Sequence, residues 1–68
     1  MTEIEFIGYF KQNVKIEFQD GEVLTGRVTS FTWAVDNVTD EAEIDLSIKN
    51  GRVITIQQSE VKNIEIIG

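Results

Sequence analysis

VKIEFQDGEVLTGRVTSF, the segment Val14–Phe31, contains two runs of alternating apolar and polar residues that are joined by Asp20-Gly21. Alternation with a period of two is typical of a β-strand that buries one face. Asp-Gly between two such runs is a strong signal for a tight hairpin turn. The segment therefore predicts an antiparallel β-hairpin.

The length of the turn determines which residues of this hairpin face each other. A two-residue loop would place Phe18 opposite Val23 and would turn Leu24 away from the buried face. A three-residue loop, with Gly21 in the left-handed conformation, places Ile16 opposite Leu24 and keeps both side chains inside. We therefore predict the three-residue loop.

Gly26 has a defined place in this register, because it lies opposite Val14 on the buried face and two residues before Val28. A glycine inside a strand marks a sharp bend or the close approach of another backbone. We expect one of these two features at Gly26.

A second hairpin is predicted around Asn50-Gly51 by the same argument. A three-residue loop over residues 49–51 gathers four large aliphatic side chains on one face: Ile44, Leu46, Ile54 and Ile56. We expect a positive φ at Gly51, as at Gly21, because such a turn needs a left-handed residue there.

The residues before the first hairpin predict a helix. Thr2 and Glu5 have the spacing of a capping box, in which each side chain bonds the backbone amide of the other residue. Phe6 and Phe10 follow four residues apart, which places them on one helical face. We expect a helix over about residues 3–12 that covers the core.

The segment between the two hairpins, Thr32–Glu43, mixes β-branched residues with Asp and Asn. We expect the strand that begins before it to continue, bent or interrupted, through Val35 or Val38. A loop at about residues 39–42 then leads into the second hairpin.

The last strand is predicted over Val61–Ile67, with Ile64 and Ile66 facing inward. The expected fold is one mainly β domain over residues 1–68, with a short N-terminal helix followed by a five-stranded, strongly bent antiparallel sheet. Five twisted strands around one core favour a small SH3-like or OB-like barrel. The strands are expected over residues 14–19, 22–31, 33–48 with a break, 52–57 and 61–67.

The composition limits the possible chemistry. Acids outnumber bases 12 to six, which gives a formal net charge of −6, and the chain has no Cys and no His. Without these two residue types most nucleophilic and transition-metal chemistry is excluded, and the negative field disfavours phosphate backbones. We therefore expect no enzyme activity, no catalytic residue, no cofactor and no metal site. The sequence shows neither a membrane span nor a signal peptide, so a cytoplasmic location is expected.

Several of these motifs resemble those of a known family. The short helix, Asp20-Gly21 and the pattern Gly26-x-Val28-x-x-Phe31 are similar to the first motif of the Sm-like proteins, and Ile54–Ile67 is similar to their second motif. The resemblance covers most of the chain. It implies a bent five-stranded sheet capped by the helix. It also implies rings in which the fourth strand of one subunit pairs with the fifth strand of the next, and such rings usually bind RNA.

The residues of the family's RNA site are missing from this chain. The Asp, stacking and Asn positions that follow Phe31 fall on Thr32, Ala34 and Asp36, and the Arg-Gly of the second motif falls on Gln57-Gln58. A carboxylate thus replaces the Asn. The resemblance supports the fold and the ring, and it carries no RNA-binding residue over to this chain.

Two further features have more than one interpretation. Five acids stand between Arg27 and Lys49 without an intervening base: Asp36, Asp40, Glu41, Glu43 and Asp45. This acidic run is a solvated loop, a surface for a basic protein partner or a divalent-cation site, although its spacing lacks the Gly and terminal Glu of a calcium-binding loop. Trp33, the only Trp, is a core or interface residue or a stacking platform for a base.

Val53 and Ile67 are the candidate interface residues. If Ile54, Ile56 and Ile64 face inward, these two residues face outward on the fourth and fifth strands. Those strands form the edges of an open sheet, and unpaired edges invite association. The expected function is a non-catalytic, homo-oligomeric binding or scaffold module with an unknown partner. The alternatives are an RNA-binding ring and an acidic adaptor for a basic protein partner.

Overall fold

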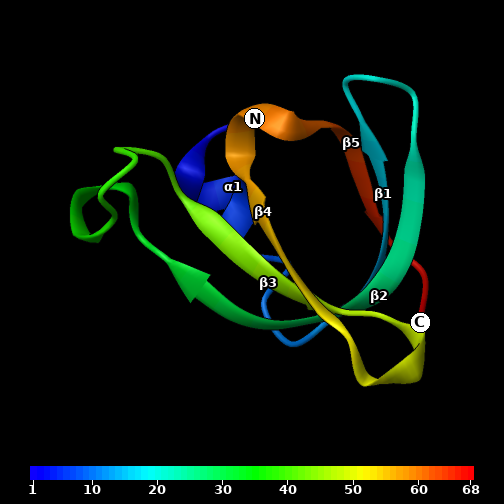
Figure 1. The fold of residues 1–68 in the computed structure, drawn as a ribbon. Coiled ribbons are helices and arrows are strands. Elements are labelled where there is room, and N and C mark those ends of the chain that lie inside the picture. Colours follow the sequence, from blue (N-terminus) through cyan, green and yellow to red (C-terminus); the bar gives the residue numbers. More distant parts are fainter.

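One short helix and five strands form the structure, and three 3-10 turns stand between the strands (Figure 1). The computed structural model describes all 68 residues. The helix and strands are α1 Glu3–Ile7, β1 Asn13–Phe18, β2 Val23–Thr32, β3 Glu43–Ser47, β4 Val53–Gln57 and β5 Val61–Ile66. The fold is mainly β, as the sequence predicts.

The five strands form one antiparallel sheet in the order β4-β3-β2-β1-β5. The sheet curves strongly around the core (Figure 1). No ladder joins β4 to β5, so the sheet is bent but not closed into a barrel. A 3-10 turn, Gln58–Glu60, carries the chain from β4 to β5, and β5 then pairs with β1. Each of the two outer strands therefore keeps one free edge.

The first hairpin has the predicted three-residue loop. Ile16 lies opposite Leu24 and Val14 lies opposite Gly26. The Phe18 amide donates to the carbonyl of Glu22 at 2.8 Å, which closes the loop. Gly21 has a φ of 90°, as this type of turn requires.

The second hairpin repeats this geometry. Leu46 lies opposite Ile54, and the Ile48 amide donates to the carbonyl of Arg52 at 2.9 Å. The predicted positive φ at Gly51 is confirmed, with a value of 72°. Asn50 also has a positive φ, 73°, which Asn tolerates better than most residues.

Gly26 lies where the backbone of β3 comes close, which confirms one of the two expected features. A Cβ atom at this position would collide with the carbonyl oxygen of Ser47 and would lie 3.0 Å from Cγ of Leu46. Only glycine therefore allows β2 and β3 to pack at this distance.

A β-bulge at Thr29 changes the phase of β2. Val28 pairs with Leu46, but Ser30 pairs with Asp45, so β2 advances two residues while β3 advances one. The bulge lets Val28 and Phe31, three residues apart, both face the core. The core contains ten buried residues: Phe6, Val14, Ile16, Val28, Ala42, Ile44, Leu46, Ile56, Val61 and Ile64.

The helix α1 begins as predicted. The Glu5 amide donates to Oγ1 of Thr2 at 3.1 Å, and the Thr2 amide donates to Oε1 of Glu5 at 2.8 Å, which is the predicted capping box. The hydrogen bond from the Thr2 amide holds the pKa of the Glu5 carboxyl below its usual value.

The helix ends at Ile7, earlier than the predicted end near residue 12. Overlapping turns continue to Lys11, where φ is 64° and the helical conformation is impossible. The Lys11 amide instead donates to the carbonyl of Val28 in β2 at 2.8 Å. Gly8 also weakens the helix by about 1 kcal/mol relative to Ala. A tertiary hydrogen bond and a poor helix former therefore end α1 early.

The prediction of a strand that continues beyond Thr32 is wrong. Residues 33–42 form a loop that contains the 3-10 turn Ala34–Asp36, and Val35 and Val38 are almost fully exposed. The amide of Ala34 donates to Oε2 of Glu3 at 2.6 Å and so has no strand partner. Valine is common in strands, but no neighbouring strand lies beside Val35 and Val38 to pair with them.

The structure contains no helix with the length and apolar character that a membrane span requires.

Candidate functional site

The free edge of β4 carries the first predicted interface residue, Val53, which is 59% exposed. Hydrogen-bonded and non-hydrogen-bonded pairs alternate along an antiparallel ladder. Because Ile48 bonds Arg52, the ladder to β3 uses the backbone of Ile54 and Ile56. The amides and carbonyls of Val53 and Thr55 therefore point to the free edge.

The free edge of β5 lies next to the second predicted residue, Ile67, which is 52% exposed. The Ile67 amide donates to the carbonyl of Asn13 at 2.9 Å. By the same alternation, the backbone groups of Ile64 and Ile66 point away from β1. Part of this edge is covered, because Oη of Tyr9 donates to the carbonyl of Ile64 at 3.3 Å.

Ile66 has the predicted orientation but is not buried. It lies opposite Val14 and so shares the core face, but it remains 53% exposed. Nothing covers the end of this outermost strand in a single chain. The β5 edge thus presents two adjacent exposed isoleucines, of which the sequence predicts only Ile67.

The strand β4 runs up to the Gln58–Glu60 turn and β5 runs back from it, so the two outer strands have opposite directions (Figure 1). The start of β4, where Val53 lies, and the end of β5 are at the same end of the molecule, near the C-terminus. One chain therefore presents two different edges, each with unpaired backbone groups and exposed aliphatic side chains.

The opposite end of the molecule contains an acidic hollow of about 300 Å³ between the 33–42 loop and the Gln58–Glu60 turn. Seven residues line it: Glu3, Ala34, Asp40, Glu41, Ala42, Gln58 and Ser59. Oε1 of Glu41 accepts the amide of Ser59 at 3.0 Å, and Glu3 accepts the amide of Ala34. Two of the three acids thus hold backbone amides in place and have a structural role.

Two of the positions that the Sm-like resemblance assigns to RNA binding line this hollow. Thr32 ends β2, Ala34 and Asp36 belong to the 3-10 turn that follows, Gln57 ends β4 and Gln58 begins the next 3-10 turn. Ala34 and Gln58 both line the hollow, which contains no aromatic residue and no base. The lining is acidic and offers a nucleotide neither a stacking face nor a cation.

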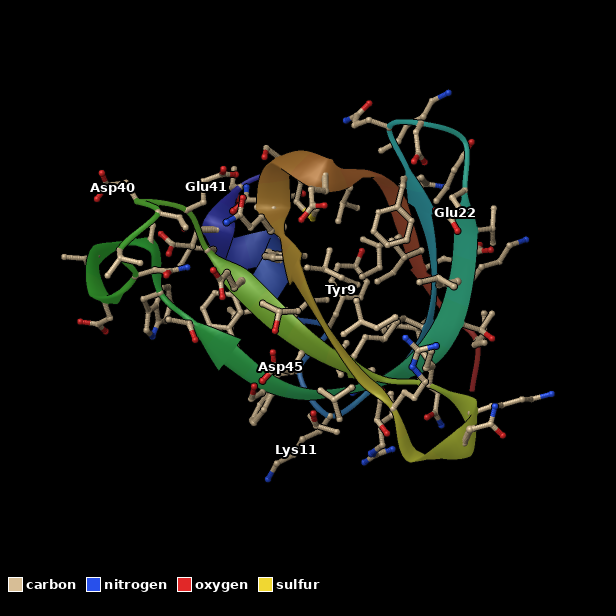
Figure 2. All side chains as sticks on the ribbon, viewed as in Figure 1. Tyr9, Lys11, Glu22, Asp40, Glu41 and Asp45 are labelled. Carbon is tan, nitrogen blue, oxygen red and sulfur yellow. The ribbon has the colours of Figure 1, made fainter.

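The acidic run is not gathered into one site. Figure 2 shows Asp45 on β3, well away from Asp40 and Glu41 in the loop. Oδ2 of Asp45 accepts from Oγ of Ser30 at 2.7 Å, and Oδ1 accepts from Oγ1 of Thr55 at 2.9 Å. The carboxylate of Asp45 thereby links three neighbouring strands, a role that its sequence context does not reveal. No group of three acids in the chain is arranged to hold a metal ion.

Trp33 packs at the rim of the core and keeps a partly exposed face. Its ring stands edge-on to Phe31, with the centroids 5.1 Å apart. Phe31 in turn contacts Phe6, with the centroids 6.0 Å apart. This aromatic chain supports the interpretation of Trp33 as a packing residue.

Comparison with protein-family models, with curated proteins and with solved structures gives no match to this chain.

Proposed function

We propose that this protein is a non-catalytic Sm-like binding or scaffold module that associates with copies of itself through the free edges of β4 and β5. The observation that carries the proposal is the pair of unlike open edges on one chain, each flanked by exposed aliphatic side chains. Pairing β4 of one copy with β5 of another would satisfy free backbone groups and cover Val53, Ile66 and Ile67.

The size of the chain supports the same proposal. At 68 residues, without a disulfide, the free energy gained by burial and the chain entropy lost on folding nearly cancel. Association adds buried surface and so stabilises the fold. Because the two edges differ, each contact is heterologous, and repetition with a fixed rotation closes a ring. The resemblance to the Sm-like family suggests five to seven subunits in a cytoplasmic ring.

Replacing Val53 with Lys tests the β4 edge. Sedimentation velocity should show that Val53→Lys dissociates into smaller species, because a charge on an edge opposes strand pairing. Val38→Lys is the matched control, since it makes the same substitution at a residue that is 98% exposed in the 33–42 loop. The control should sediment like the unmodified protein. Equal behaviour of both variants would contradict pairing through β4.

An RNA titration separates this proposal from an RNA-binding ring. Uridine-rich RNA should not bind tightly in physiological salt, because the positions of the family's RNA site hold Ala34, Asp36 and Gln57-Gln58 around an acidic hollow. Fluorescence anisotropy with labelled RNA gives the affinity. Submicromolar binding would favour the RNA-binding alternative over a scaffold with an unknown partner.

A further inference from the structure

Three of the six basic residues gather at the end of the molecule that holds the Lys49–Gly51 turn. Arg27, Lys49 and Arg52 line two adjoining hollows of about 310 and 320 Å³, which share Thr25 and Lys49. Thr25 and Arg27 point to the same outer face of β2, because alternate residues of a strand share a face. The turn that follows β3 places Lys49 and Arg52 beside that face.

Neither hollow contains an acidic residue, although the chain has 12 acids. Every other hollow of the molecule has at least one acid in its lining. The two basic hollows are therefore a local exception to the negative charge of the whole chain. Thr25 and Ser47 add hydroxyl donors to their walls, whereas Nδ2 of Asn13 already donates to the Gly68 oxygen at 3.0 Å.

The three cations are also free of ion pairs. The only salt bridge in the structure joins Lys62 to Glu17 at 3.9 Å, and Lys11 stands over the ring of Phe10. Three like charges without a carboxylate within reach repel one another, and a bound anion would relieve this repulsion. Arginine and hydroxyl donors together match the geometry of a phosphate group.

We propose that these two hollows form one binding site for a phosphomonoester dianion, held by Arg27, Lys49 and Arg52. The site adjoins the proposed interface, because Ile67, which edge pairing would cover, also lines one of the hollows. It favours a small phosphorylated ligand over a nucleic acid, because its lining has no aromatic side chain on which a base could stack and the net charge of −6 repels a polyanion.

A titration with inorganic phosphate tests the proposal on the intact protein. Two-dimensional NMR at pH 7.5, where phosphate is largely dianionic, should show saturable shifts of the Thr25, Arg27 and Ser47 amides and of the 49–52 turn. A parallel titration with sodium chloride at equal ionic strength should give no saturation. The double variant R27Q/R52Q should bind phosphate at least tenfold more weakly.

The control variant K11Q/K62Q also removes two positive charges, from residues that line neither hollow. The control should bind phosphate within about twofold of the unmodified protein, because salt screens the attraction between the ligand and charges outside the site. The proposal fails if phosphate gives no saturable shift beyond that of chloride in the unmodified protein. It also fails if both double variants lose the same affinity, since the effect would then reflect net charge alone.

Discussion

The interior strands and the edge strands of this sheet carry the same kinds of aliphatic side chain in opposite surroundings. Ile16 in β1, Val28 in β2 and Leu46 in β3 are fully buried. Val53 at the start of β4 and Ile66 at the end of β5 are more than half exposed. The difference has two causes: Val53 lies on the outer face of its strand, and Ile66 lies on the core face at the end of an outer strand that has a neighbour on one side only.

This contrast separates the residues that stabilise the single folded chain from the residues that remain available for contacts with other molecules. Five of the ten buried residues lie in β1, β2 and β3, and Gly26 fixes the spacing between two of these strands. The exposed residues of the edges add little to the stability of one chain. Substitutions in the interior should therefore act on folding, and substitutions at the edges should act on association.

The largest effect is expected from Leu46→Ala in β3. Removal of this fully buried side chain leaves a cavity, and the free energy of unfolding should fall by about 2–5 kcal/mol. Urea denaturation at a fixed low protein concentration measures the change. Val53→Ala at the β4 edge should cost less than about 0.5 kcal/mol under the same conditions. Similar losses in the two variants would remove the distinction between interior and edge.

A smaller loss is expected from Gly26→Ala. The added methyl group collides with the carbonyl of Ser47, and overpacking of this kind costs about 1–3 kcal/mol. Gly68→Ala is the control, because nothing lies within 4 Å of a Cβ atom at that position. Thermal unfolding should show a lower Tm for the first variant only. An unchanged Tm for Gly26→Ala would mean that β2 and β3 are not held as closely as the structure shows.

Gly51→Ala should destabilise the protein less than Leu46→Ala and Gly26→Ala. Space is available for the methyl group, so only the positive φ of 72° causes strain, which amounts to about 1 kcal/mol. Gly51→Asn should cost less, because Asn tolerates the left-handed conformation. Denaturation of both variants gives the comparison. Equal stability of Gly51→Ala and the unmodified protein would count against the three-residue turn.

The two hairpins could be predicted from the sequence because their determinants are local. Asp20-Gly21 and Asn50-Gly51 supply left-handed residues, and only one register buries the alternating aliphatic residues on both sides of each turn. The capping box of Thr2 and Glu5 is local in the same sense. The exposed position of Val53 also follows from simple alternation.

The features that could not be predicted depend on contacts between distant segments. The helix ends early because the Lys11 amide bonds β2, and the 33–42 loop is held by Glu3. The acid-free hollows around Arg27 and Lys49 form only when β2 and the second turn come together. In sequence these two bases are 22 residues apart and give no signal of a shared site.

Light scattering coupled to size exclusion in moderate salt, about 0.15 M, tests the central claim of edge-mediated self-association most directly. Pairing of β4 in one copy with β5 in the next predicts a discrete oligomer, with a mass that is a whole multiple of 7.7 kDa. Because each subunit carries a net charge of −6, the oligomer should become more stable as the salt concentration rises. A mass of 7.7 kDa at every accessible protein and salt concentration would contradict the account.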